Sequence, residues 1–528
     1  MALLLLCWAR PAGAETPAET AARLAIEGRA IGSARGAGGD PQTSVAQSVT
    51  SSRPSANLDT SIQDQLGAAG DPFGFRAYLK DRGLTYSLTY IGEGLGNVSG
   101  GFRRRGIYEG LLDLEIDVDL GPLLGWTGAA LHTNLFQIHG AGLSHGAIGN
   151  LITVSGIEAL PSSRVYELWF EQKLFGEQFG LKFGQIAADT EFAVTQTGTV
   201  FVNSTFGWPN NMAVVIPSGG PIYPLAVPGV RGKYVPDANL SFQVGLFDGD
   251  PAGPARGNRD PDPQRRNRTG TNFRTDDPAL VIAEASYAYN IEAGSTGEAG
   301  TVTLGGWYHF GRFDSLRTDS AGTSLAAPSS TGIARRFRGQ AGLYGLVDQT
   351  IYREPDDPND GASVFLRASG SPADRSLVDF YADVGIAYKG LLPGRSDDTV
   401  GLAFGLSRTS PEARGLDTDA ILATGLVTPR RSSEAVLEAT YQAVLGPGRH
   451  APAGLPVRVS PRRRHPEPAR GERCPHPQRG GVRPARDDPV LSLTPPPVRA
   501  ATGGGPCGRG PRPAPPPARS RRGCAARR

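Results

Sequence analysis

Apolar and polar residues alternate in short runs between about residue 73 and residue 445. In the clearest run, residues 112–120, apolar residues occupy every second position and acidic residues occupy the four positions between them. Successive side chains of a β-strand point to opposite faces, so this run predicts a strand with one apolar and one acidic face. Comparable runs occur at 84–90, 240–246, 301–310 and 378–388. The chain is therefore predicted to be all-β.

Aromatic and acidic positions favour a membrane barrel over a soluble sheet. Aromatic residues end several apolar rows, as the interfacial girdles of a membrane barrel require: Tyr90, Tyr287, Tyr289, Phe310 and Tyr388. A soluble core could not bury a row of four acids, whereas a water-filled lumen solvates it. The polar stretch 256–278 suits a long surface loop. We therefore expect a transmembrane antiparallel β-barrel, with a secreted β-rich soluble protein as the alternative.

The N-terminal residues have the pattern of a secretory signal. An apolar run from Leu3 to Ala9 precedes the small-residue sequence Ala-Gly-Ala at 12–14. We predict a cleaved signal peptide at 1–14 and export from the cytoplasm. Residues 15–70 are rich in Ala, Gly, Ser and Thr and are expected to be low in complexity, with a short helix. No apolar run reaches the ~18 residues of a transmembrane helix.

The C-terminal residues 449–528 differ from the rest in charge. They contain 18 arginines against 4 acidic residues, which leaves 36 basic and 47 acidic residues in 1–448. An acidic body does not suit a nucleic-acid backbone, and the tail has no aromatic residue on which bases could stack. We therefore expect a disordered Arg- and Pro-rich tail and no nucleic-acid partner.

No catalytic or metal-binding constellation stands out. The seven histidines are scattered, and the sequence contains no HExxH or P-loop motif. No cysteine lies between residues 8 and 473, which excludes disulfides, thiolate metal sites and a cysteine nucleophile there. We expect no enzyme activity, no catalytic residue and no metal.

Residues 161–251 carry a series of short motifs in a fixed order. They are RVYELWFEQ, LKFGQIAADTEFA, FVNSTFGWPNN, PSGGPIYPLAVPGVR and GLFDGDPAG. In this order the chain closely resembles the carbohydrate-selective porins of the OprB type over roughly residues 70 to 445. The resemblance implies a sixteen-stranded barrel at 71–448 in the outer membrane of a Gram-negative cell. It implies passive diffusion of mono- and disaccharides without a cofactor, and a general or anion-type porin stays open as the alternative. Outer-membrane lipid, lipopolysaccharide and further copies of the chain are the expected partners.

The resemblance and the chemistry of sugars together suggest pore-lining residues. A sugar constriction needs planar donors, carboxylate acceptors and an aromatic plate. The candidates are Glu167, Trp169, Asn203, Trp208, Arg164, Asp189 and Arg231. Strand alternation places Tyr166, Leu168 and Phe170 outward, and Glu167, Trp169 and Glu171 towards the lumen. Another interpretation is that Arg164 and Asp189 form a structural Arg–carboxylate brace that fixes an inward loop. Trp208 would then anchor that loop by packing against the wall.

The tail also departs from the family pattern, which ends in two further strands and a terminal phenylalanine. We chose codons that are compatible with the written residues and read them one nucleotide forward from His450. In that frame residues 450–469 can encode TLQPDFQYVFHPGGGIPNP, and residues 474–491 can encode ARIPNAAVFGLRATIRF. The second peptide ends in phenylalanine and can be followed by a stop codon. We therefore predict a frameshift between about 445 and 450, so that the last strands are lost from the chain as written.

Overall fold

The computed structural model describes residues 7–8, 62, 66, 69–253, 260–291, 295–355, 360–426, 428–446 and 449–459. The expectations for residues 1–14 and 15–70 lie largely outside these residues, as do those for the tail beyond 459. The helical elements in the described part are η3 (Pro72–Gly74), α4 (Phe75–Lys80), α5 (Leu120–Leu124), η4 (Ser144–Ile148), η5 (Ala188–Thr190), η6 (Thr197–Val200), α6 (Ser204–Gly207), α7 (Asn210–Val215), η7 (Pro217–Gly219), α8 (Pro263–Arg266) and α9 (Pro411–Thr424). None of these helices is both long and apolar enough to cross a bilayer.

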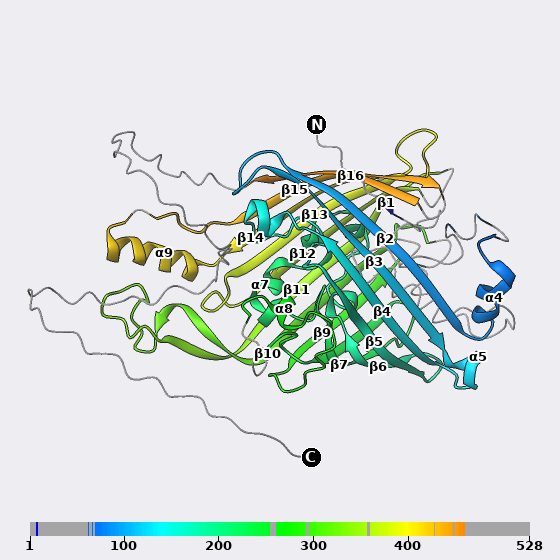
Figure 1. Ribbon diagram of the computed structural model, residues 1–528, viewed down its shortest axis with the longest axis horizontal. Coiled ribbons are helices and arrows are strands. Elements are labelled where there is room, and N and C mark those ends of the chain that lie inside the picture. Colours follow the sequence, from blue (N-terminus) through cyan, green and yellow to red (C-terminus); the bar gives the residue numbers. More distant parts are fainter. Residues whose placement is uncertain are drawn as a thin grey trace, which may run out of the picture. The chain divides into compact units, whose positions relative to one another are not determined.

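The strands form one closed antiparallel barrel in which chain neighbours are also spatial neighbours (Figure 1). They are β1 (Cys7–Trp8), β2 (Leu84–Asn97), β3 (Arg105–Asp119), β4 (Ala129–Gly140), β5 (Ser162–Leu174), β6 (Phe179–Ile186), β7 (Val227–Tyr234), β8 (Leu240–Phe247), β9 (Leu280–Tyr289), β10 (Gly300–Asp319), β11 (Ala334–Arg353), β12 (Gly361–Gly370), β13 (Val378–Lys389), β14 (Thr399–Thr409), β15 (Glu434–Gly446) and β16 (Arg449–Val459). The predicted all-β barrel is confirmed.

The two faces of the barrel wall are reversed relative to a soluble protein. On the outer face, Leu304 of β10 and Leu343 of β11 are 66% and 75% exposed. On the inner face, Glu284 of β9 and Asp348 of β11 are buried. The predicted row of acids in β3 also faces the interior, where Asp113 is 5% exposed. An apolar outer band and a polar interior are the arrangement of an outer-membrane barrel.

Two strands, β16 and the two-residue β1, close the barrel between β15 and β2. Residues 449–459 belong to the tail in our sequence-based expectation, and the structure instead pairs them with β15 as the eleven-residue strand β16. Two of them, Pro452 and Pro456, have no backbone N–H to donate to a neighbouring strand. Only two residues of β1 join β16 to β2, and both fall within the predicted signal peptide. The seam between β16 and β2 therefore has much less pairing than the rest of the wall.

The connections at the two ends of the barrel differ in length. At the end near α9, the strands are joined by the long segments 141–161, 187–226, 248–279 and 410–433. The opposite end, near α4 and α5, has shorter turns. Outer-membrane barrels have short periplasmic turns and longer extracellular loops. The α9 end is therefore the extracellular end.

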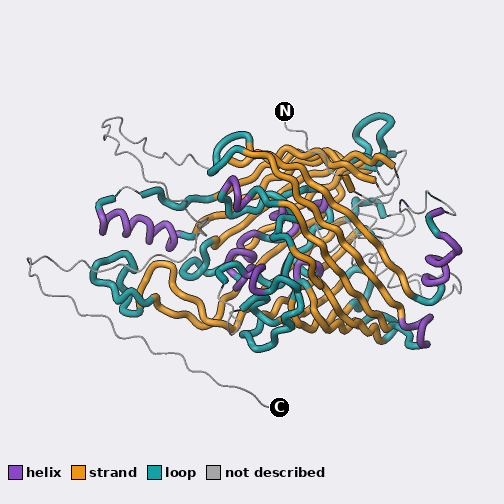
Figure 2. The backbone as a smooth tube through the Cα atoms, in the orientation of Figure 1, coloured by secondary structure: helices purple, strands orange, loops and turns teal. Residues whose placement is uncertain are grey.

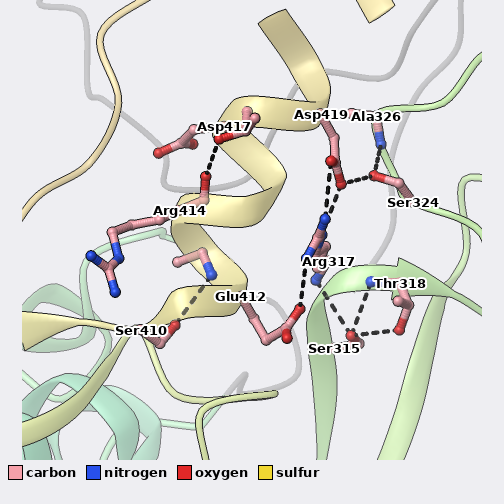
Figure 3. Close-up of polar contacts among 12 residues, drawn as sticks. Ser315, Arg317, Thr318, Ser324, Ala326, Ser410, Glu412, Arg414, Asp417 and Asp419 are labelled. Carbon is pink, nitrogen blue, oxygen red and sulfur yellow. Dashed lines mark hydrogen bonds and ion pairs between the residues drawn. The ribbon is translucent and has the colours of Figure 1, made fainter. Parts of the chain in front are cut away.

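Helix α9 is fastened to the β10–β11 hairpin, which extends beyond the neighbouring strands at this end (Figure 2). Asp419 of α9 accepts hydrogen bonds from Nε of Arg317 (2.8 Å) and from the hydroxyl of Ser324 (2.6 Å), as Figure 3 shows. Ser410 caps the helix by accepting from the backbone N–H of Ala413 (3.2 Å). The hydrogen bond from Arg317 lowers the pKa of Asp419 below its ordinary value, so this contact carries full charge at neutral pH.

Candidate functional site

Residues 187–226, which connect β6 to β7, fold into the barrel interior and are called the inner loop here. Three carboxylates on the far strands β9, β11 and β15, namely Glu284, Asp348 and Glu438, accept hydrogen bonds from backbone N–H groups of this loop. The donor–acceptor distances lie between 2.7 and 3.1 Å. Strand β15 is eight strands away from β7 in the barrel order. The inner loop must therefore cross the lumen to reach Glu438.

Strand β5 holds both ends of the inner loop. Glu167 accepts a hydrogen bond from the backbone N–H of Ala187, at the start of the loop, at 2.9 Å. Arg164 donates from Nη1 to the carbonyl oxygen of Pro224, near its end, at 2.5 Å. Both side chains are buried, with exposed fractions of 6% and 3%. In the structure these two predicted residues fasten the loop.

A β-bulge in β5 corrects one part of the predicted strand phase. Asn134 pairs with Glu167 and Leu135 with Val165, which leaves Tyr166 without a partner on β4. Tyr166 is 1% exposed, so the prediction that it faces outward is wrong. An extra residue in one strand re-aims the side chains around it, and this allows Arg164 and Glu167 to face the same side.

Asp189 reaches β5 through the re-aimed tyrosine. Its carboxylate accepts hydrogen bonds from the hydroxyl of Tyr166 (2.9 Å) and from the backbone N–H of Tyr223 (2.9 Å). Tyr223 lies near the other end of the inner loop. Asp189 therefore joins the two ends of the loop to each other and to the wall.

A fully buried arginine on the opposite wall holds the middle of the inner loop. Arg367 of β12 is 0% exposed and forms an ion pair with Asp383 of β13 at 2.6 Å. Its guanidinium also donates to the carbonyl oxygens of Ala193 (2.8 Å), Thr205 (2.7 Å) and Phe206 (3.0 Å). One side chain thus ties two strands to two separate stretches of the loop, at 193 and at 205–206.

Charged side chains from three adjacent strands converge on the loop from the other side. Glu171 of β5, Lys182 of β6 and Arg231 of β7 are paired in register and form one row across the wall. Glu191 of the inner loop accepts from Nζ of Lys182 (2.5 Å) and Nε of Arg231 (3.0 Å). Arg231 also contacts Glu171 through Nη1 at 3.0 Å. The row and Glu191 together therefore place two cations and two carboxylates at the lumen.

The predicted aromatic candidates are packed rather than open. Trp169 stacks on His132, with ring centroids 4.7 Å apart, and Nζ of Lys182 lies 3.8 Å from the centre of its ring. Trp208 belongs to the same apolar cluster and is 5% exposed. Asn203 is 3% exposed and caps α6 by accepting from the backbone N–H of Thr205 at 3.1 Å. These positions set the shape of the inner loop, and a sugar contact at them stays a prediction.

A cavity of about 230 Å³ lies between the charged row, the inner loop and the strands up to β11. It is below the ~300–1,000 Å³ of pockets for drug-sized ligands, as suits a small solute. Its polar lining includes Glu171, Glu191, Arg231, Lys233, Gln243 and Ser286. Of the seven predicted residues, Arg231 alone lines this cavity. Within the described residues no group of three His, Cys, Asp or Glu side chains is arranged to hold a metal ion.

Comparison with known proteins identifies the family. Residues 103–448 match the model described as carbohydrate-selective porin, OprB family. This chain belongs to that family. It is 25% identical over 347 residues to Porin B of Pseudomonas aeruginosa, a match covering 63% of this chain and 72% of the relative. The solved high-pH structure of Pseudomonas putida OprB has the same fold, with a TM-score of 0.64 and 22% identity over 74% of this chain and 97% of that one.

The porin is therefore an outer-membrane sugar channel, as the resemblance predicted, rather than an enzyme. The second expected class, a secreted soluble β-protein, is excluded by the same findings together with the apolar outer face of the barrel.

Several residues of the porin's interior were not among the predicted ones. Three of them are cations at inward-facing positions of strands whose outward-facing positions are apolar, as in Leu181-Lys182-Phe183. They are Lys182, Lys233 and Arg367. That signal was present in the sequence, because a cation between two apolar residues marks the polar face of such a strand. Glu191 carried no such signal, since its position depends on the path of the inner loop.

Proposed function

We propose that mono- and disaccharides cross this porin through the cavity beside the charged row, and that the inner loop sets the width of the passage. The observation that carries the proposal is the lining of that cavity by cations, anions and neutral polar groups together. Arg231, the predicted residue that lines it, is the candidate sugar contact, and the other six predicted residues act by holding the inner loop in place.

A sugar suits such a surface because each hydroxyl both donates and accepts hydrogen bonds. Carboxylates such as Glu171 accept from hydroxyl groups, whereas Arg231 and Lys233 donate to them. Most of these charges are already engaged with one another, as the contacts of Glu191 show. Binding therefore stays weak enough for a solute to leave, which conduction requires. A lining of both signs also favours neutral sugars over the anions that an anion-type porin would select.

We further propose the following surroundings for the channel. The apolar outer band contacts outer-membrane lipid and lipopolysaccharide, and the barrels associate as homo-oligomers. The mature chain begins after a signal peptide at 1–14, and residues 71–448 form the body of the barrel.

The decisive experiment measures sugar binding in the open channel. Lys233 lines the cavity and forms no ion pair with any described residue, so its ammonium can donate to a passing sugar. Losing one charge-assisted hydrogen bond, about 1.5 kcal/mol, weakens binding roughly tenfold. We expect Lys233→Met to weaken the block of ion current by glucose by that factor in planar bilayers. Lys80→Met, on the exposed face of α4 outside the barrel, is the matched control.

Liposome swelling separates the proposal from its alternative. Glucose and maltose should enter faster than gluconate of similar size. Faster entry of gluconate, or an unchanged glucose block in Lys233→Met, would overturn the proposed passage.

A further inference from the structure

The outer face of the β10–β11 hairpin changes from apolar to aromatic to cationic towards the extracellular end. Leu343 is 75% exposed, and Tyr308 and Phe310 further along are 40% and 60% exposed. Beyond these aromatic residues, Arg312 and Arg338 are both exposed. Phe313, the residue after Arg312, faces the interior and packs on the buried ring of His309, with ring centroids 5.2 Å apart. The arginines therefore lie on the lipid side, above the aromatic girdle.

Arg312 and Arg338 are cross-strand partners. Like charges directly opposite each other on neighbouring strands are destabilising. No described residue forms an ion pair with either arginine, whereas the next pair along, Arg336 and Asp314, forms one at 3.2 Å. The hairpin thus keeps two uncompensated cations side by side on its outer face. An anion between them would remove this repulsion.

A groove of about 850 Å³ runs down the same outer face, below the arginines. Small residues from three strands form its floor, and Leu343 and Tyr308 lie along it. The lining includes Val281, Ala283, Gly306, Ala341 and Pro372. Ala341 pairs with Tyr308, four residues before Arg312 on β10, so the groove begins about 13 Å below the arginine pair at ~3.3 Å per residue. The groove faces the hydrocarbon of the membrane and is apolar.

We propose that this surface binds one phosphorylated glycolipid of the outer leaflet, a lipid A-type molecule. A phosphate lies between Arg312 and Arg338, and an acyl chain fills the groove beneath. Guanidinium groups bind phosphate through paired hydrogen bonds, and clustered cations at the membrane surface attract anionic headgroups. A lipid satisfies both parts of the surface at once, since its charged group and its apolar chain are at the depths that the arginines and the groove occupy. A second barrel would have to bring an anion to the same place.

The test uses the full-length porin in detergent micelles and native mass spectrometry. The probes are bisphosphorylated lipid A, its dephosphorylated form and phosphatidylglycerol. In the double variant Arg312→Gln/Arg338→Gln, we expect the affinity for bisphosphorylated lipid A to fall at least tenfold. The matched control is Arg103→Gln/Arg104→Gln, which removes the same charge from exposed positions in the β2–β3 connection at the same end of the barrel. This control should bind like the unmodified porin.

A second variant tests the groove without changing charge. Ala283→Trp fills its floor and should also weaken lipid A binding, while heat-modifiable mobility in gels shows that each variant is folded. Dephosphorylated lipid A should bind the unmodified porin as weakly as lipid A binds the arginine variant. Phosphatidylglycerol has one phosphate where lipid A has two, and it should bind more weakly than bisphosphorylated lipid A. Equal binding of all three lipids would overturn the proposal. So would a loss of oligomers in Ala283→Trp with lipid A affinity unchanged, because that result assigns the groove to a second copy of the chain.

Discussion

Replacing Arg367 by methionine tests whether one buried side chain holds the inner loop. The guanidinium of Arg367 and the carboxylate of Asp383 are both 0% exposed, and they lie 2.6 Å apart. Methionine preserves much of the length and apolar volume of arginine but removes its charge and its donors. Asp383 would then be buried without its partner, and removing one partner of a buried pair costs about 3–5 kcal/mol. We expect the free energy of unfolding to fall by that amount.

The matched control is Arg408→Met. Arg408 forms the same kind of two-point contact with Asp379, at 2.7 and 3.0 Å, but its side chain is 49% exposed. Asp379 itself is only 5% exposed, but the exposed Arg408 lets water reach the contact. Ion pairs that water reaches contribute about 0–1 kcal/mol, so this variant should lose much less stability than Arg367→Met. Urea unfolding followed by tryptophan fluorescence gives both values. Trp208 reports on the inner loop directly, because it packs in the cluster at the loop's centre.

The double variant Arg367→Met/Asp383→Leu separates the cost of an unpaired charge from the loss of the contact. Replacing both partners by apolar residues is often neutral or stabilising, so stability should recover, while the inner loop still lacks the donors to its carbonyl groups. Increased current noise in the double variant would show that the loop has been released. The reasoning fails if Arg367→Met and Arg408→Met lose the same stability within about 1 kcal/mol, the size expected for an exposed pair.

Three further outcomes are expected. Asn203→Ala removes the cap of α6 and should lower the free energy of unfolding by about 0.5–2 kcal/mol in the same urea assay. Because Arg317 lowers the pKa of Asp419, the contact of α9 is present above the ordinary carboxyl value of about 3.9 and is lost as pH falls below it. Peptic cleavage of residues 410–433, measured relative to an unfolded substrate between pH 2 and pH 5, should rise as the pH falls through that range, whereas Asp419→Asn should be cleaved readily throughout it. Resequencing across codons 440–460 should show that the third-position bias of the gene leaves the written frame there, and an undisturbed bias through residue 490 would disprove the frameshift.

Strand content and the direction of side chains could be read from the sequence because they are local. A strand repeats every two residues, so the acidic row of β3 was assigned to the interior without knowledge of its neighbours. Where a strand contains a bulge the repeat is broken, and the assignment of Tyr166 was wrong for this reason. A bulge depends on how two strands pair, and nothing in one strand alone marks it.

The candidate site could be predicted only in part. Arg231 lines the cavity, and Arg164, Glu167 and Asp189 hold the inner loop. Arg164 and Asp189 do so through a carbonyl oxygen, a hydroxyl and a backbone N–H, whereas the sequence suggested an Arg–carboxylate brace. The contacts that hold the loop to the far strands could not be predicted, because Glu438 and the backbone of residues 202–203 that it binds are more than 200 positions apart in the chain.

The sequence by itself determined that the porin is a barrel with an apolar outside, a polar lumen and a long polar loop at 256–278, since hydrophobic periodicity and loop composition are properties of neighbouring residues. The tertiary structure alone decided which carboxylates and which arginine hold the inner loop, and how the charged row meets it. Those contacts join strands on opposite sides of the barrel, and they exist only once the wall has curved to bring distant residues within hydrogen-bond distance.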